Sequence, residues 1–174
     1  MFGSRFEPGR LETLYRVHRE ELFRYAARFT GDPDLAADVV QEAFVKLALH
    51  PPANDNALRA WLFRTATTIA IDAQRSSRRR ALLHDRHAAE LPLGTRAPDP
   101  AHSAEQSELR RQVHAALDTL SPRDRAALLM RVEGFSYREI AAAVGTTTNA
   151  VGVVLARAMA KLAPHLADQQ RSDR

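Results

Sequence analysis

Near the C-terminus, three small or branched residues are spaced as in two helices joined by a tight glycine turn. Ala141 is small where the helices would touch, Gly145 follows four residues later, and Val151 follows ten residues later. Ser136 and Glu139 have the spacing of a capping box at the start of the first helix. Such a pair packs as an ordinary hairpin in a core, or it places its second helix in the major groove of DNA. The spacing alone does not decide between these interpretations.

Apolar residues recur at helical spacing along most of the chain, and no segment shows the convincing alternation of a strand. Asp32 and Pro33 are the predicted N-cap and first helical residue of the second helix. Ser103 opens a second capping-box pattern, and Thr148 is the predicted cap of the last helix. The sequence therefore predicts an all-α fold, with helices at about 11–29, 33–49, 57–80, 103–120, 122–133, 136–144 and 148–166.

A segment that contains proline and acidic residues separates two helical regions. Pro92, Gly94, Pro98 and Pro100 interrupt the helical periodicity there. Residues 81–108 carry a formal charge of −3, whereas the rest of the chain carries +7. We therefore predict two small helical domains, at 1–80 and 109–168, joined by a flexible acidic linker at 81–108.

Composition disfavours several classes of protein. The 174 residues carry a formal net charge of +4 and include no cysteine, so neither disulfides nor cysteine-ligated zinc is expected. We find no metal-spaced cluster, phosphate-binding glycine loop or nucleophile arrangement, so no catalytic residue, metal or cofactor is predicted. No apolar run is long enough to span a membrane, and the N-terminus has no apolar signal core. The expected location is the cytoplasm, and the basic balance favours a polyanionic partner.

Three sequence blocks resemble RNA polymerase sigma factors of the sigma-70 family, in particular the small extracytoplasmic-function (ECF) group. Residues 120–141, beginning Leu-Ser-Pro-Arg-Asp-Arg, resemble region 4 of that family. Residues 38–46, Asp-Val-Val-Gln-Glu-Ala-Phe-Val-Lys, resemble region 2.2, and residues 59–72 resemble regions 2.3 to 2.4. The resemblance spans 11–80 and 109–166, in the family's order. It implies a protein that is not an enzyme but binds core polymerase, recognises the −10 and −35 promoter elements and promotes initiation.

The resemblance also implies which residues bind core polymerase. In the family, region 2.2 docks on the clamp helices of the largest subunit, and the flap is a second expected contact. The implicated residues are Asp38, Val39, Val40, Gln41, Glu42, Phe44 and Lys46. Phe44 is expected to lie in the core, with Val39 and Val40 packing partly beneath the polar side chains. The alternative is a solvated helix face with no partner.

Contacts to the −10 element are implied for the loop before the third helix and for that helix. In the family, the loop captures a flipped base, and basic side chains hold promoter phosphates. The implicated residues are Asn54, Asp55, Asn56, Arg59, Trp61, Arg64, Thr67, Thr68, Arg75, Arg78, Arg79 and Arg80. Trp61 fits a core position better than a base-stacking one, and Asp55 or Asn56 is expected to cap the helix. Thr67 and Thr68 replace the family's usual Arg-Asn, so the −10 readout is expected to differ.

Contacts to the −35 element are implied for the helix-turn-helix. The implicated residues are Arg125, Tyr137, Arg138, Thr147, Thr148, Asn149 and Arg157. The second helix departs from the family, because Gly152, Val153, Val154 and Ala156 cannot make bidentate arginine–guanine contacts. We expect recognition through phosphate, DNA shape or apolar contact, or a protein-binding role for the valines.

Two other functions fit parts of the sequence. A conventional helix-turn-helix regulator explains the C-terminal motif but leaves the region 2 blocks unexplained. A sigma-like protein that only binds other proteins would explain why the second helix has few residues able to read bases. Such a protein has no need for the cationic cluster at 75–80. A possible partner is an anti-sigma factor, which many family members bind.

Overall fold

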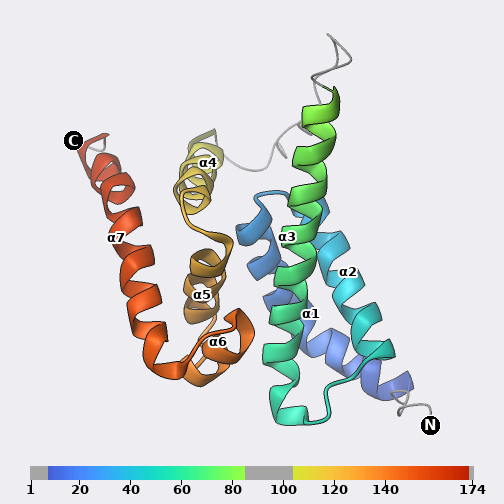
Figure 1. Ribbon diagram of the computed structural model, residues 1–174. Coiled ribbons are helices and arrows are strands. Elements are labelled where there is room, and N and C mark those ends of the chain that lie inside the picture. Colours follow the sequence, from blue (N-terminus) through green and yellow to red (C-terminus); the bar gives the residue numbers. More distant parts are fainter. Residues whose placement is uncertain (1–7, 85–103, 173–174) are drawn as a thin grey trace.

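The computed structural model describes residues 8–84 and 104–172, and within them it contains helices and no strand (Figure 1). The predicted all-α fold is confirmed. The elements of the N-terminal half are α1 (Pro8–Thr30), α2 (Pro33–Leu49), the 3-10 turn η1 (Asp55–Ala57) and α3 (Leu58–His84). Those of the C-terminal half are α4 (Ala104–Asp118), α5 (Pro122–Val132), α6 (Tyr137–Val144) and α7 (Thr148–Ser172).

Local side-chain chemistry sets several helix ends. Asp32 accepts hydrogen bonds from the amides of Asp34 and Leu35, at 2.9 and 3.1 Å, and so caps α2 as predicted. Ser136 and Glu139 form the predicted capping box of α6. Gly145 ends α6 with a φ of 69°, a left-handed conformation that favours glycine.

Other predicted helix ends differ from the structure. Thr147, rather than Thr148, caps α7, because its hydroxyl lies 3.3 Å from the amide of Ala150. Asn54, rather than Asp55 or Asn56, caps η1, since its side chain accepts a hydrogen bond from the Asn56 amide at 2.9 Å. Helices α3 and α4 extend into the predicted linker as far as His84 and back to Ala104. The rest of that linker and the Ser103 capping box lie outside the described residues.

The N-terminal half is a three-helix bundle with an aromatic centre. Tyr25 and Phe29 of α1 and Phe63 of α3 are buried, and the Tyr25 and Phe63 ring centres are 4.9 Å apart. The Tyr25 hydroxyl lies 2.6 Å from the hydroxyl of Thr67 on α3. This pairing satisfies a buried polar group and fixes α1 against α3.

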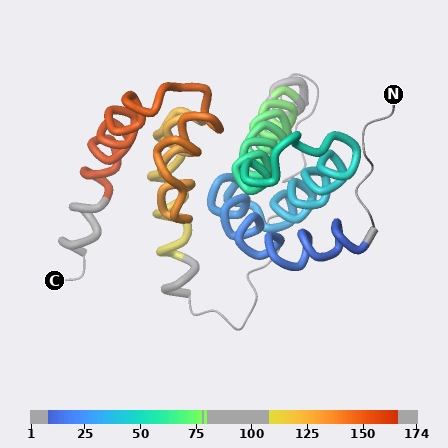
Figure 2. The backbone as a smooth tube through the Cα atoms, turned by 90° about the horizontal axis from the view of Figure 1, so that it is seen from below, coloured from blue at the N-terminus to red at the C-terminus, as the bar shows by residue number. Residues whose placement is uncertain are grey.

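The C-terminal half packs α5, α6 and α7 around Met130, Ile140 and Val151, all fully buried. Leu109 and Val113 of α4 share the helical spacing of buried Leu117, but both side chains are exposed. Helix α7 lies on the side of the molecule away from α1–α3 in both overall views (Figures 1 and 2).

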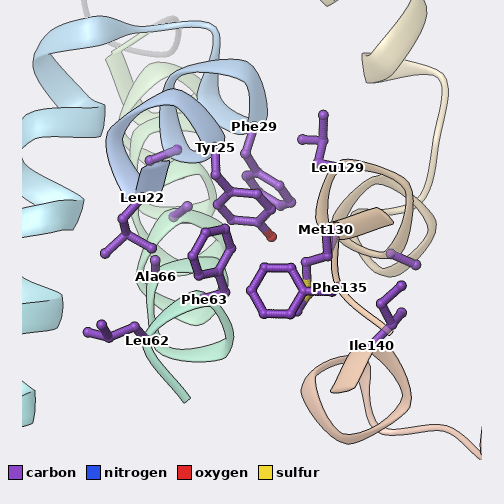
Figure 3. Packing of buried hydrophobic residues seen from close by; sticks show 14 of the residues in the cluster. Leu22, Tyr25, Phe29, Leu62, Phe63, Ala66, Leu129, Met130, Phe135 and Ile140 are labelled. Carbon is purple, nitrogen blue, oxygen red and sulfur yellow. The ribbon is translucent and has the colours of Figure 1, made fainter. Parts of the chain in front are cut away.

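The two halves share one hydrophobic core. Phe135, in the turn before α6, lies beside Phe63, with ring centres 4.6 Å apart (Figure 3). Helices α1 and α3 also contact α5, and the buried residues form a continuous cluster across the boundary. The domains expected at 1–80 and 109–168 are therefore closely packed on each other in this structure.

Candidate polymerase and DNA interfaces

Helix α2 places the predicted polymerase-binding residues in two layers. Asp38, Gln41 and Glu42 are exposed, while Lys46 is half-buried and lies 3.1 Å from the Glu42 carboxylate. Beneath them Val39, Val40 and Phe44 are buried, and Phe44 has the expected core position. The helix thus presents a polar surface over an apolar support, an arrangement that suits a partner helix.

An open groove continues this surface onto α1. Its volume is about 480 Å³, and its lining residues are Tyr15, Arg19, Glu20, Phe23, Arg24, Ala37, Val40 and Gln41. Phe23 remains 38% exposed in the groove. The α1 wall was not predicted, because Tyr15 has the same helical spacing as Leu22 and Phe29, which are buried. An aromatic residue at an outward helical position, as Phe23 is, is the sequence signal for such a wall.

The loop before α3 presents polar groups to solvent. Asn54, Asp55 and Asn56 are exposed, and Asp55 forms an ion pair with Arg10 of α1. Trp61 is partly buried against the core. The side-chain oxygen of Asn54 already accepts a bond from the backbone. Of the two asparagine side chains, that of Asn56 is therefore more available to bond to a partner.

The predicted −10 residues on α3 fall into different environments. Thr67 is half-buried and bonds to Tyr25, whereas Thr68 and Arg64 are exposed. Arg75, 73% exposed, and Arg79 lie on the exposed end of α3. Arg78 and Arg80 also belong to this helix, but their side chains lie outside the described residues.

Arg59 is engaged between the two halves. Its guanidinium bonds to the Glu21 carboxylate at 2.9 Å and donates to the carbonyl oxygen of Glu133 at 2.8 Å. Burial raises the pKa of Glu21, but the hydrogen bonds with Arg59 and His18 and the charges of those two residues together outweigh it and leave that pKa lowered. In this arrangement Arg59 holds protein groups rather than facing open solvent.

Arg125 is likewise an internal residue, only 4% exposed. It donates to the carbonyl oxygens of Leu117 and Phe29, at 3.0 and 2.8 Å, and pairs with Asp118 at 2.6 Å. Phe29 belongs to α1, so Arg125 connects the two halves. Contact between Arg125 and DNA would require this connection to break.

The other predicted −35 residues lie around the turn between α6 and α7. Tyr137, Arg138, Thr147, Thr148 and Asn149 are exposed. The Arg157 side chain forms an ion pair with Asp124 of α5, which is only 2% exposed. Burial raises the pKa of Asp124, but the hydrogen bonds from Arg157 and Ser121 and the positive charges of Arg157 and Lys161 together outweigh it and leave that pKa lowered.

Arg123 was missed by the sequence analysis. It is exposed, and its guanidinium donates to the carbonyl oxygen of Gly145 at 3.0 Å, which fixes it beside the helix-turn-helix turn. Residues two apart on a helix point about 200° from each other. Arg123 and Arg125 therefore cannot share a face, and the structure places Arg123 outward.

Within the described residues, no three His, Asp or Glu side chains gather as metal ligands do. Across the same ranges, no single helix is long and apolar enough to cross a bilayer; only α6 and α7 taken together pass that test, across an 84° bend.

Comparison with known proteins identifies both halves. The family description "Sigma-70 region 2" matches residues 14–80, and "Sigma-70, region 4" matches residues 110–162. The ECF RNA polymerase sigma factor SigL of Mycobacterium tuberculosis (strain ATCC 25618 / H37Rv) is 34% identical over 149 residues, which cover 83% of this chain and 82% of SigL. The chain belongs to the ECF RNA polymerase sigma factors of the sigma-70 family.

Longer relatives from the same family also match, and solved structures share the fold. SigG of the same strain is 34% identical over 168 residues, but the chain spans only 45% of its length. SigE of Mycolicibacterium smegmatis is 31% identical, and the chain spans 61% of it. The structure of CnrH in complex with the cytosolic domain of CnrY has a TM-score of 0.69 and 26% identity, covering 94% of this chain and 91% of CnrH. RpoE, solved with the anti-sigma factor NepR from Bartonella quintana, shares the fold at a TM-score of 0.64 and 23% identity. The match covers 90% of this chain and 96% of the chain in that structure.

Proposed function

We propose that the chain is an alternative sigma factor that binds core RNA polymerase, engages the −10 and −35 elements and starts transcription without covalent chemistry of its own. The observation that carries this proposal is the two-layered surface of α2. Exposed Asp38, Gln41 and Glu42 lie over buried valines beside an open groove, in the part of the chain that matches region 2. Work on chromosomal DNA with polymerase would place the protein in the cytoplasm.

DNA engagement is assigned to three surfaces. The loop at 50–56 is proposed to take an unpaired −10 base, because its exposed amides suit hydrogen bonds to a base edge. The exposed arginines at the end of α3, Arg75 and Arg79, are proposed to hold promoter phosphates. The N-terminus of α7 is proposed to face the −35 element, with Arg123 and Arg138 at its border.

Action at both elements requires the two halves to separate. The elements lie roughly 25 base pairs apart, which is about 85 Å at 3.4 Å per base pair. In this structure Phe63 and Phe135, one from each half, are in contact at 4.6 Å. We infer that the described arrangement is a closed form, and that binding to polymerase opens it. Opening also breaks the bond from Arg59 to Glu133 and the bond from Arg125 to Phe29.

A protein that binds the chain is a second proposed partner. CnrH, which is 26% identical, was solved with the cytosolic domain of CnrY. This supports, for our chain, an anti-sigma factor that competes with polymerase for the groove between α1 and α2. A conventional helix-turn-helix regulator is less well supported, because it does not account for the region 2 match at 14–80.

The proposed function is tested with purified chain and core polymerase. We expect specific transcription from promoters that core polymerase alone does not use. Glu42→Lys, alone or with Gln41→Lys, should weaken core binding while the fold stays intact. Glu108→Lys is the matched control, because Glu108 also pairs with a cation one turn along its helix but lies on α4. Absence of core binding together with no stimulated transcription would refute the proposal. Unchanged binding of Glu42→Lys would refute the α2 interface.

A further inference from the structure

The outward face of α7 carries no charged side chain over its first turns. Asn149, Val153 and Ala156 are exposed and lie on one face, because spacings of four and seven residues return to nearly the same direction. Val153 is 68% exposed, the most of any large apolar residue in the described part of the chain. Val151, Val154 and Leu155 on the other side of the helix are buried and hold α7 to α5 and α6.

Cations border this face. Arg123 is held at the turn by its bond to the Gly145 carbonyl, and Arg138 is exposed on α6. Arg157 lies further along α7 and pairs with buried Asp124. No acidic residue occurs between Glu139 and Asp168 in the sequence. A neutral face bordered by positive charge suits duplex DNA, whose phosphates flank the groove that holds the base edges.

The side chains on this face favour particular base pairs. Guanine is usually bound by arginine or lysine, and Arg157, one turn beyond Val153 on this side of α7, is held in an ion pair with buried Asp124. The amide of Asn149 can form a bidentate pair with adenine, and apolar side chains pack on the thymine methyl group. We propose that α7 reads A·T base pairs at the −35 element, with Val153 as the specificity-determining residue that contacts a thymine methyl.

This inference rests on the proposed sigma-factor function and adds the chemistry of its −35 recognition. A protein partner on the same face is the rival. The bordering arginines favour the polyanion, because the rim of the face complements phosphate.

The test uses holoenzyme assembled from the full chain and core polymerase. Duplex DNA randomised across the −35 region is selected for promoter binding, and each selected thymine is then replaced by deoxyuridine, which lacks only the methyl group. We expect A·T-rich selected sequences and at least one position where deoxyuridine weakens binding about three- to fivefold. In Val153→Ala, binding to the thymine and deoxyuridine forms should be equal at that position. Met159→Ala is the control, because Met159 is exposed on α7 but about 120° away from Val153.

Other results would contradict the role of Val153, the recognition of A·T pairs by α7, or the sigma-factor function itself. A G·C-rich selected element, or a deoxyuridine effect that Val153→Ala leaves intact, overturns the role of Val153. Promoters selected only through the −10 element overturn A·T recognition by α7 while the sigma-factor function stands. No core binding and no promoter selection at all overturn both.

Discussion

The guanidinium carbon of Arg59 lies 3.8 Å from the centre of the Phe135 ring. Arg59 belongs to α3 and Phe135 to the turn before α6, so this contact joins the two halves of the chain. The same guanidinium donates to the Glu133 carbonyl oxygen, and the Glu133 carboxylate pairs with Arg28 of α1 at 2.9 Å. Arg59, which the family resemblance assigns to DNA binding, thus takes part in the contact that holds the two halves together.

The two halves also approach each other closely at Gly31, where the ring of His114 leaves no room for a side chain. A Cβ atom added there would lie 2.1 Å from Nε2 of His114 on α4. We predict that Gly31→Ala forces the His114 ring out of its contact with the end of α1 and, by removing that contact between the halves, weakens the closed form. Because the chain has no cysteine, labels on Val45→Cys and Met159→Cys report the change as a longer interdomain distance.

Gly145→Ala is the matched control for Gly31→Ala. Both glycines have a positive φ, 73° and 69°, so both alanines carry similar backbone strain of about 1–2 kcal/mol. A Cβ at Gly145 meets nothing within 4 Å. Only Gly31→Ala should lengthen the label distance, and His114→Ala should restore the short distance in the double variant. Equal distances in both glycine variants would contradict the proposed contact.

Arg125 and Arg123 are predicted to have opposite roles. Arg125→Ala removes the buried hydrogen bonds to the carbonyl oxygens of Leu117 and Phe29 and the ion pair with Asp118, and should lower the free energy of unfolding by about 2–4 kcal/mol, measured by urea denaturation. Arg123→Ala should change it by less than about 1 kcal/mol, because the side chain is exposed. If Arg123 contacts a phosphate, its loss weakens promoter binding and reduces the salt dependence by about one counterion. Similar stability losses in both variants would contradict this division.

Local features of the fold could be predicted from the sequence, whereas long-range pairings could not. Asp32 and the Ser136–Glu139 box were correctly placed because a cap depends on residues three positions away. The Arg125–Phe29 bond joins residues 96 positions apart. Helical periodicity indicates that a residue faces inward, but it does not say which helix it will meet.

The same limit applies to the candidate site. The family pattern identified the outward residues of α2, since their exposure follows from the helix's own period. The family pattern did not indicate that Arg59 and Arg125 would bond across the boundary between the halves. Those bonds form only once both halves are folded and packed on each other. Helical direction alone could have favoured Arg123 over Arg125 as a DNA contact, because Arg125 lies one turn before buried Leu129 on the same face of α5.

Acid is predicted to weaken the C-terminal half through Asp124. Its folded-state pKa is lowered, so the stability it contributes is present above its unfolded value of about 3.8 and is lost as the pH falls through the folded value. Asp124→Asn should therefore be less stable than the native chain near pH 7, by about 1–2 kcal/mol, and the difference should shrink below about pH 4. Denaturation between pH 3 and pH 7 measures this.

Asp72→Asn serves as the control for the acid experiment. Asp72 is exposed and lies 4.0 Å from Arg75, so its removal should change stability by less than about 0.5 kcal/mol at any pH in the range. A stability gap between native chain and Asp124→Asn that stays constant with pH would rule out Asp124 as the titrating group.

Gly152 offers a variant in which stability and DNA binding should move in opposite directions. A Cβ at this position meets only Cε2 of Tyr137, at 3.9 Å, which is ordinary van der Waals contact. Gly152→Ala should therefore raise the free energy of unfolding by about 1 kcal/mol, the usual gain for a helix interior. If the DNA backbone or a base edge approaches α7 next to Val153, the added methyl group should nevertheless weaken binding to the −35 element. Denaturation and promoter binding, with a template lacking that element as the control, separate the two effects. A variant that is more stable and binds the −35 element as well as the native chain would show that nothing approaches Gly152 closely.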